Sequence, residues 1–169
     1  MVTEIITIIA NIALALSLVV ALIFGVAQVR AAARDRRERL TLETLRAFQT
    51  REFAELIHYI VNTELPKSQE GLAKLPVAEQ VIFIELAQKM ESLGILVADK
   101  LIDLDLVDKT LGSFVTMAWR KYSTMFLDMR KEDPFLGEYF QWLAGQIEDR
   151  LKYHPRQPFY QYKPNHTHK

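Results

Sequence analysis

The sequence predicts an all-α protein with one N-terminal transmembrane helix followed by a compact cytoplasmic bundle of four or five helices. Three observations support this fold class: residues 5–29 carry no charge, five arginines follow almost at once, and the apolar residues beyond recur at helical spacing. We expect four parts, namely a membrane span at 1–29, an arginine-rich juxtamembrane helix at 30–49, a helical domain at 50–154 and a tail at 155–169.

The uncharged run is long enough to cross a membrane. A helix needs roughly 20 apolar residues to cross a hydrocarbon core about 30 Å thick. A cleaved signal peptide is disfavoured, because Glu4 precedes the run, no Lys or Arg does, and the run is longer than such peptides need. The positive charge on its C-terminal side predicts that the N-terminus lies outside and the remaining chain lies in the cytoplasm.

The arginines after the run are expected at the depth of the lipid headgroups. Their favoured role is to determine topology, and specific recognition of anionic lipid is the alternative. The set comprises Arg30, Arg34, Arg36, Arg37 and Arg39.

Small residues recur every four positions within the span. Such spacing places them on one stripe, along which another helix can approach closely. The stripe predicts either packing against a partner helix, from a second copy or from another protein, or a plain anchor with coincidental spacing. Its members are Ala13, Ser17, Ala21 and Gly25.

The next segments are predicted from helix start and stop signals. The span is expected to continue as a helix until a break near Thr50, which is a suitable N-cap for a helix that ends before Pro66. A polar connector follows, and Pro76 suits the first turn of the next helix. Gly94 is predicted to close that helix with a left-handed residue.

The second half of the chain is predicted to hold two longer helices. Residues 95–111 are apolar but interrupted by aspartates, which predicts short helical turns, with Asp103 or Asp105 as a cap. Longer helices are expected over residues 113–131 and from a start after Pro134 to a stop near His154. The tail either lies over the domain, binds a partner as an extended segment or remains a mobile terminus.

The composition argues against several function classes. Lys plus Arg and Asp plus Glu each total 21, so no basic excess favours nucleic-acid binding. The chain has no cysteine, and its glycines are too far apart for a phosphate-binding loop. Glu55 and His58 have the spacing of di-iron ligands, but no second Glu-x-x-His accompanies them, so a surface pair is the better interpretation. We therefore expect no cofactor, no metal and no catalytic residues.

The order of segments resembles a bacterial family of uncharacterised membrane-anchored helical proteins. The resemblance covers most of residues 5–151. It depends on hydrophobic patterns, in particular those of residues 42–48, 91–97 and 104–107, together with Trp119. It implies the same architecture and a bacterial inner membrane, but no activity and no functional residues.

The favoured hypothesis is a non-enzymatic, single-pass inner-membrane protein whose cytoplasmic domain is an interaction or assembly module. A self-associating effector or channel accessory is the first alternative, and an enzyme that uses buried carboxylates is a more remote one. The expected partners are membrane lipid and another transmembrane helix, with a homo-oligomer as one outcome. Aromatic residues are favoured at interfaces, although the tryptophans suit a core equally well. The predicted partner contacts are Trp119, Trp142, Phe159, Tyr160 and Tyr162.

Overall fold

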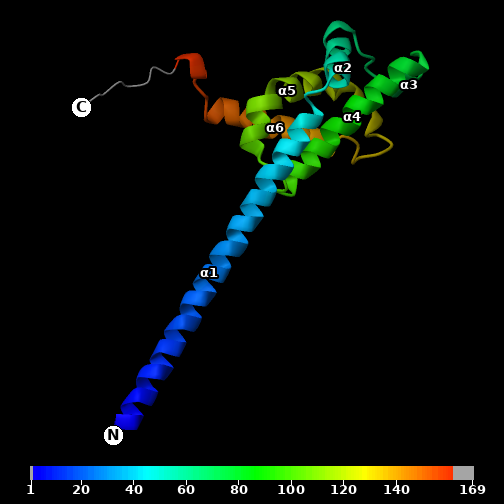
Figure 1. The fold of residues 1–169 in the computed structure, drawn as a ribbon. Coiled ribbons are helices and arrows are strands. Elements are labelled where there is room, and N and C mark those ends of the chain that lie inside the picture. Colours follow the sequence, from blue (N-terminus) through cyan, green and yellow to red (C-terminus); the bar gives the residue numbers. More distant parts are fainter. Residues whose placement is uncertain (1, 162–169) are drawn as a thin grey trace.

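The computed structural model describes residues 2–161, and within them every regular element is a helix. This confirms the all-α class. The long helix α1 (Val2–Ala47) runs away from a helical domain, and the domain is built by α2 to α6 (Figure 1). The short 3₁₀ helix η1 (Phe159–Gln161) follows α6 and lies to one side of the domain.

Helix α1 divides into two halves with opposite environments. Its 46 residues correspond to about 69 Å at 1.5 Å per residue. The N-terminal half is apolar and its most hydrophobic window is entirely exposed, whereas Thr41 and Leu45 near the C-terminal end are buried in the domain. The prediction that one helix continues through the arginines to a break near Thr50 is confirmed, because α1 ends at Ala47 and α2 begins at Arg51.

Side-chain caps explain where α2 and α3 begin. Helix α2 (Arg51–Asn62) starts at Thr50, whose hydroxyl accepts a hydrogen bond from the Phe53 amide, as predicted. The connector after Pro66 is not wholly irregular, because it contains the short helix α3 (Gln69–Ala73). Ser68 caps this helix by accepting from the Gly71 amide at 3.1 Å.

Two predictions for the middle of the chain are wrong. Helix α4 (Val77–Ala98) does not close at Gly94 but continues for another turn. Gly94 serves a different purpose, because a Cβ atom built there would lie 2.4 Å from the carbonyl oxygen of Tyr139. The glycine thus lets α4 lie close to the chain at the start of α6, and α4 and α6 pack extensively.

The predicted short turns after residue 95 are absent. The first residues of the 95–111 segment belong to helix α4. Its last residues belong to a single long helix, α5 (Leu104–Met129). Asp103 caps α5 by accepting from the Leu106 amide at 3.1 Å, as expected for one of the two candidate caps. Of the aspartates in this segment, Asp99 follows the end of α4, Asp103 caps α5, and the other two lie within α5.

Helix α6 (Glu138–Tyr153) completes the domain, close to its predicted bounds, and ends before Pro155. Glu91 on α4 accepts hydrogen bonds from the Tyr139 and Phe140 amides, at 3.2 and 2.8 Å, and so satisfies the free amides of the first turn of α6. An aromatic cluster fills the centre between α4, α5 and α6 and consists of Phe83, Trp119, Tyr122, Phe126 and Phe140.

Candidate interaction site

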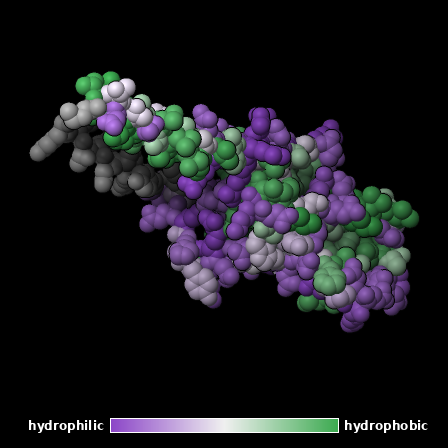
Figure 2. Space-filling model, turned by 90° about the horizontal axis from the view of Figure 1, so that it is seen from below, coloured by the Kyte–Doolittle hydropathy of each residue, from purple (hydrophilic) through white to green (hydrophobic). Residues whose placement is uncertain are grey.

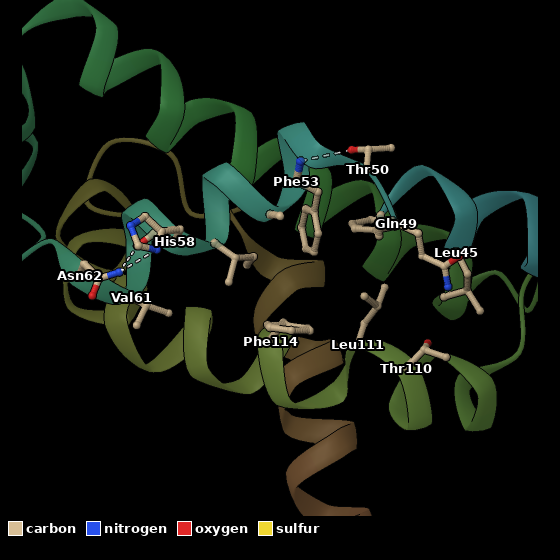
Figure 3. A pocket seen from close by; sticks show the side chains of 13 residues that line it. Leu45, Gln49, Thr50, Phe53, His58, Val61, Asn62, Thr110, Leu111 and Phe114 are labelled. Carbon is tan, nitrogen blue, oxygen red and sulfur yellow. Dashed lines mark hydrogen bonds between the residues drawn. The ribbon is translucent and has the colours of Figure 1, made fainter.

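An apolar groove of about 560 Å³ lies where the end of α1 meets α2 and α5. Figure 3 shows Phe53 from α2 and Leu111 and Phe114 from α5 around a common space. Edge-to-face contacts join Phe53 to Phe48, with ring centroids 5.0 Å apart, and to Phe114 at 6.2 Å. The floor is buried, but Phe114 on the wall remains 39% exposed and Val61 at the mouth 49%. The groove therefore offers apolar surface to a partner.

The polar side chains around the groove are bonded to the protein itself. Thr50 caps α2, Thr110 donates to the Leu106 carbonyl, and the Asn62 amide nitrogen contacts both the ring nitrogen and the carbonyl oxygen of His58 (Figure 3). Thr50 also forms a side-chain hydrogen bond with Glu52. The groove suits recognition of apolar side chains better than chemistry.

Glu55 and His58, the pair with di-iron spacing, each have a different partner on α2. Glu55 accepts a hydrogen bond from Arg51 at 2.7 Å, and His58 is engaged by Asn62 at 3.2 Å. Within residues 2–161, no group of three or more His, Cys, Asp or Glu side chains could hold a metal ion. The pair lies on the surface of α2, and nothing in the described chain adds further ligands to it.

Two of the predicted headgroup arginines have partners in the protein. Arg34 donates to Glu38 at 2.9 Å, and this hydrogen bond raises the pKa of the Arg34 guanidinium. Arg37 lies 3.3 Å from the Asp103 carboxylate and 3.4 Å from the Ile102 carbonyl oxygen, and so joins α1 to the start of α5. Arg30, Arg36 and Arg39 are exposed on α1.

Thr41 completes the junction between α1 and α5. Its hydroxyl donates to the Arg37 carbonyl at 2.8 Å and accepts from the Asp103 amide at 3.1 Å, and the residue is fully buried. A crevice of about 500 Å³ opens beside it, lined by α1 residues that include Arg34 and Leu42 and, at the start of α5, by Asp103 and Leu106. Sequence reasoning missed this junction, because nothing local to Thr41 indicates a partner 62 residues away.

The small-residue stripe on α1 is fully accessible. Ala13, Ser17, Ala21 and Gly25 are exposed, and no other part of the chain lies within 4 Å of a Cβ built at Gly25. The Ser17 hydroxyl donates to the Ala13 carbonyl at 2.8 Å. The serine hydroxyl therefore has its hydrogen-bond partner within α1, and the stripe presents only small side chains.

The described members of the predicted aromatic contact set lie in different surroundings. Trp119 is half-buried, stacks on Phe126 at 5.7 Å and meets Phe140 edge to face at 5.2 Å, so it belongs largely to the core. Trp142 is 38% exposed and Tyr160 86% exposed. Phe159 starts η1, and Tyr162 lies outside the described residues.

An ionic cluster between α5, α6 and the following segment was not predicted. Asp108 is buried and lies 3.3 Å from Arg156 and 3.6 Å from Arg150, while Arg150 donates to Asp105 at 2.7 Å. The hydrogen bond from Lys109, together with the nearby arginines, lowers the pKa of Asp105 below the usual carboxyl range. The three-residue spacing of Asp105 and Asp108 was the available signal, since it places both on one helix face.

Comparison with known proteins gives a family but no activity. Neither the curated proteins nor the solved structures contain a match to this chain. A family model described as a domain of unknown function (DUF4760) matches residues 12–147, which includes most of α1, all of α2 to α5 and the greater part of α6. Because this match covers well over half of the sequence, the chain belongs to the DUF4760 family.

Proposed function

We propose that the protein is a non-enzymatic, single-pass membrane protein whose helical domain is an interaction or assembly module, an accessory subunit of a bacterial inner-membrane complex. The observation that carries the proposal is the contrast within α1. Its apolar window is entirely exposed, while its other end is buried in the domain. An uncovered apolar helix of this length needs lipid or another protein around it.

The same helix supports a direction for the anchor. The arginines begin directly after the apolar run, between this run and the helical domain. The positive-inside tendency then favours a cytoplasmic domain and an N-terminus outside. Since α1 passes unbroken from the apolar run into the domain, the anchor would hold the domain rigidly near the membrane rather than tether it on a flexible linker.

The groove between α1, α2 and α5 is the surface we assign to a protein partner. It combines exposed aromatic and aliphatic walls with polar groups that are already satisfied. Outside the groove, Asp105 is paired with Lys109 and Arg150, which favours a structural role for that carboxylate.

The experiment is purification of the full chain from native membranes in mild detergent, with co-purified proteins identified by mass spectrometry. Phe114→Asp places a charge in the groove, and Leu127→Asp places the same charge at a 57% exposed site on α5 outside it. A membrane-complex subunit recovered with the wild type and with Leu127→Asp, but lost with Phe114→Asp, supports the proposal. Equal recovery with both variants contradicts the role of the groove.

The anchor is tested separately. We expect the protein to remain in the membrane fraction after an alkaline wash, which releases peripheral proteins. Single cysteines at Thr3 and at Val77 should react with a membrane-impermeant reagent from opposite sides. Release by the wash, or reaction from the same side, contradicts the anchor or its topology.

Self-association through the span is the second candidate. The small-residue stripe on α1 favours self-association, because small residues let two helices approach closely. It consists of Ala13, Ser17, Ala21 and Gly25. The chain has no native cysteine. Single cysteines at Ala21 and at Leu22, on neighbouring faces, should therefore give disulfide-linked dimers at Ala21 alone if the stripe is a self-interface. Equal crosslinking at both positions, or none at Ala21, contradicts a self-interface along the stripe.

A further inference from the structure

We propose that Asn11, in the membrane span of α1, pairs with Asn11 of a second copy of this chain. The inference rests on the proposed anchoring of α1 in a membrane and adds a partner for one face of that helix. This face differs from the small-residue stripe, because Asn11 and Ala13 are two residues apart, which is about 200° around a helix. The pairing therefore leaves most of the stripe to a helix of another protein.

The side chain of Asn11 has hydrogen-bonding groups without a partner in the described chain. The Thr7 and Ser17 hydroxyls donate to α1 carbonyls four residues earlier, at 2.9 and 2.8 Å. The Asn11 carboxamide makes no such bond within residues 2–161. An asparagine side chain offers two N–H donors and an oxygen acceptor, so it carries more unmet polarity than a hydroxyl.

The depth of Asn11 makes this unmet polarity costly. Asn11 lies six residues past Ile5, where the uncharged run starts, which corresponds to about 9 Å along the helix. Polar groups in the hydrocarbon core find no water and need a protein partner. Gln28 differs, because it stands at the other end of the run, next to Val29 and Arg30, with headgroups and water within reach. Asn11 therefore needs a partner that lies in the membrane.

The partner of Asn11 comes from outside the described chain. In Figure 1 the N-terminal half of α1 extends away from the domain. Its apolar window is entirely exposed, whereas the domain, seen from below, is mostly hydrophilic with small separate apolar patches (Figure 2). A second copy supplies what Asn11 needs. A carboxamide is both donor and acceptor, so two of them related by a two-fold axis pair reciprocally.

The residues around Asn11 form a seam suited to a second helix. Exposed positions recur at alternating spacings of three and four, the pattern with which two helices supercoil around each other. One asparagine among apolar seam positions fixes the register of the pair. The seam meets the small-residue stripe only at Gly25. It consists of Ile8, Asn11, Ala15, Leu18, Leu22 and Gly25.

A pair along this seam is compatible with the position of the domain. The domain packs on α1 at Thr41, which follows Asn11 by 30 residues and so lies about a third of a turn away from the seam. Two helices joined at the seam therefore carry their domains beside the interface. Glu4 continues the seam spacing outside the uncharged run, where water weakens the repulsion between two copies.

Disulfide crosslinking tests the seam, because the chain has no cysteine of its own. Leu18→Cys lies on the seam, and Leu16→Cys lies at nearly the same depth on another face. Both leucines are exposed, at 72% and 61%. In lipid vesicles under mild oxidation we expect disulfide-linked dimers of Leu18→Cys and few of Leu16→Cys. Equal dimer yields indicate random collision and overturn the seam.

Energy transfer between full chains in vesicles tests Asn11 itself. Donor and acceptor labels are placed at Val77→Cys, a site that is 75% exposed on α4, and pairing is followed as lipid is added. Loss of an interhelical hydrogen bond in Asn11→Leu should lower the dimerisation constant by about 3- to 30-fold. Asn11→Gln keeps the carboxamide and should retain most of the pairing.

Ser17→Leu, on the stripe, is the matched control and should leave the dimerisation constant unchanged. A constant for Asn11→Leu equal to that of the wild type overturns the role of Asn11. Loss of pairing in Ser17→Leu alone assigns the self-interface to the stripe and also overturns the proposal.

Flotation of the same vesicles separates this inference from the proposed anchor. Chains that float with the vesicles but show no energy transfer at any dilution leave the anchor intact. They overturn the self-pairing and leave Asn11 to a helix of another protein. Chains that do not float overturn the anchor, and this inference with it.

Discussion

The two halves of α1 form one unbroken helix but meet different surroundings. Every residue from Thr3 to Arg39 is exposed, whereas Thr41 and Leu45 are buried against the domain. Helix geometry is the same in both halves, so the difference lies in the side chains and in what the rest of the chain supplies. In the N-terminal half nothing from the domain reaches the helix. In the C-terminal half, Arg37, Thr41 and Leu45 make contacts that are far apart in sequence.

This contrast shows that apolar character alone does not tell which residues form the core. The most apolar segment of the chain contributes nothing to the core of the described protein, while a threonine on the same helix is fully buried. Burial in the second half comes with specific hydrogen bonds, whereas the apolar window in the first half is entirely exposed. Substitutions in the two halves should therefore have very different effects on the stability of the domain.

The largest expected effect on stability comes from comparing two glycines, one in the domain and one in the exposed half of α1. Gly94 is buried on α4, and its Cβ would lie 2.4 Å from the Tyr139 carbonyl oxygen, whereas nothing lies within 4 Å of a Cβ at Gly25. Gly94→Val should separate α4 from α6 and cost about 3 kcal/mol or more of unfolding free energy. Gly25→Val should leave the domain stability unchanged. Chemical denaturation in detergent, followed by tryptophan fluorescence, measures both.

Leucine truncation extends the comparison along α1 itself. Leu45 is 5% exposed and packs into the core, and Leu18 is 72% exposed. Leu45→Ala should cost about 2–3 kcal/mol, because it removes buried methyl groups and leaves a cavity beside the groove. Leu18→Ala should not change the denaturation midpoint of the domain. Similar losses in the two variants would show that the halves are energetically coupled.

The comparison also explains what could be predicted from the sequence. Local signals were sufficient for the helical class, for the Thr50 cap and for the end of α6 near Pro155, because each depends on neighbouring residues. They left the cap of α5 open between Asp103 and Asp105. Gly94 was misinterpreted because a glycine that ends a helix and one that permits close approach look alike in one sequence. The groove could not be predicted, since its walls come from three helices.

A smaller effect is expected at the α1–α5 junction. Thr41→Val keeps the shape of the side chain but removes the acceptor for the Asp103 amide. Leaving that amide without a partner should cost about 1–3 kcal/mol. Thr7→Val removes a comparable hydroxyl bond, to the Thr3 carbonyl, in the exposed half and should leave the domain unchanged. Hydrogen exchange at residues 100–106 should accelerate in Thr41→Val alone, and exchange that is unaltered there would mean that the bond does not hold the loop.

The smallest effect concerns pH and is confined to the domain. The pKa of Asp105 is lowered in the folded protein, chiefly by the hydrogen bond from Lys109 and then by the charges of Lys109, Arg150 and Arg156. Its contribution to stability is therefore fully present above the unfolded value, about 3.9, and is lost as the pH falls through the lower folded value. Asp105→Asn should flatten this acid-side decline by lowering the denaturation midpoint slightly at neutral pH, with little change at acid pH. The residue is partly exposed, so added salt should weaken the effect. An acid-side slope that is identical in Asp105→Asn and the wild type would assign the decline to other carboxylates.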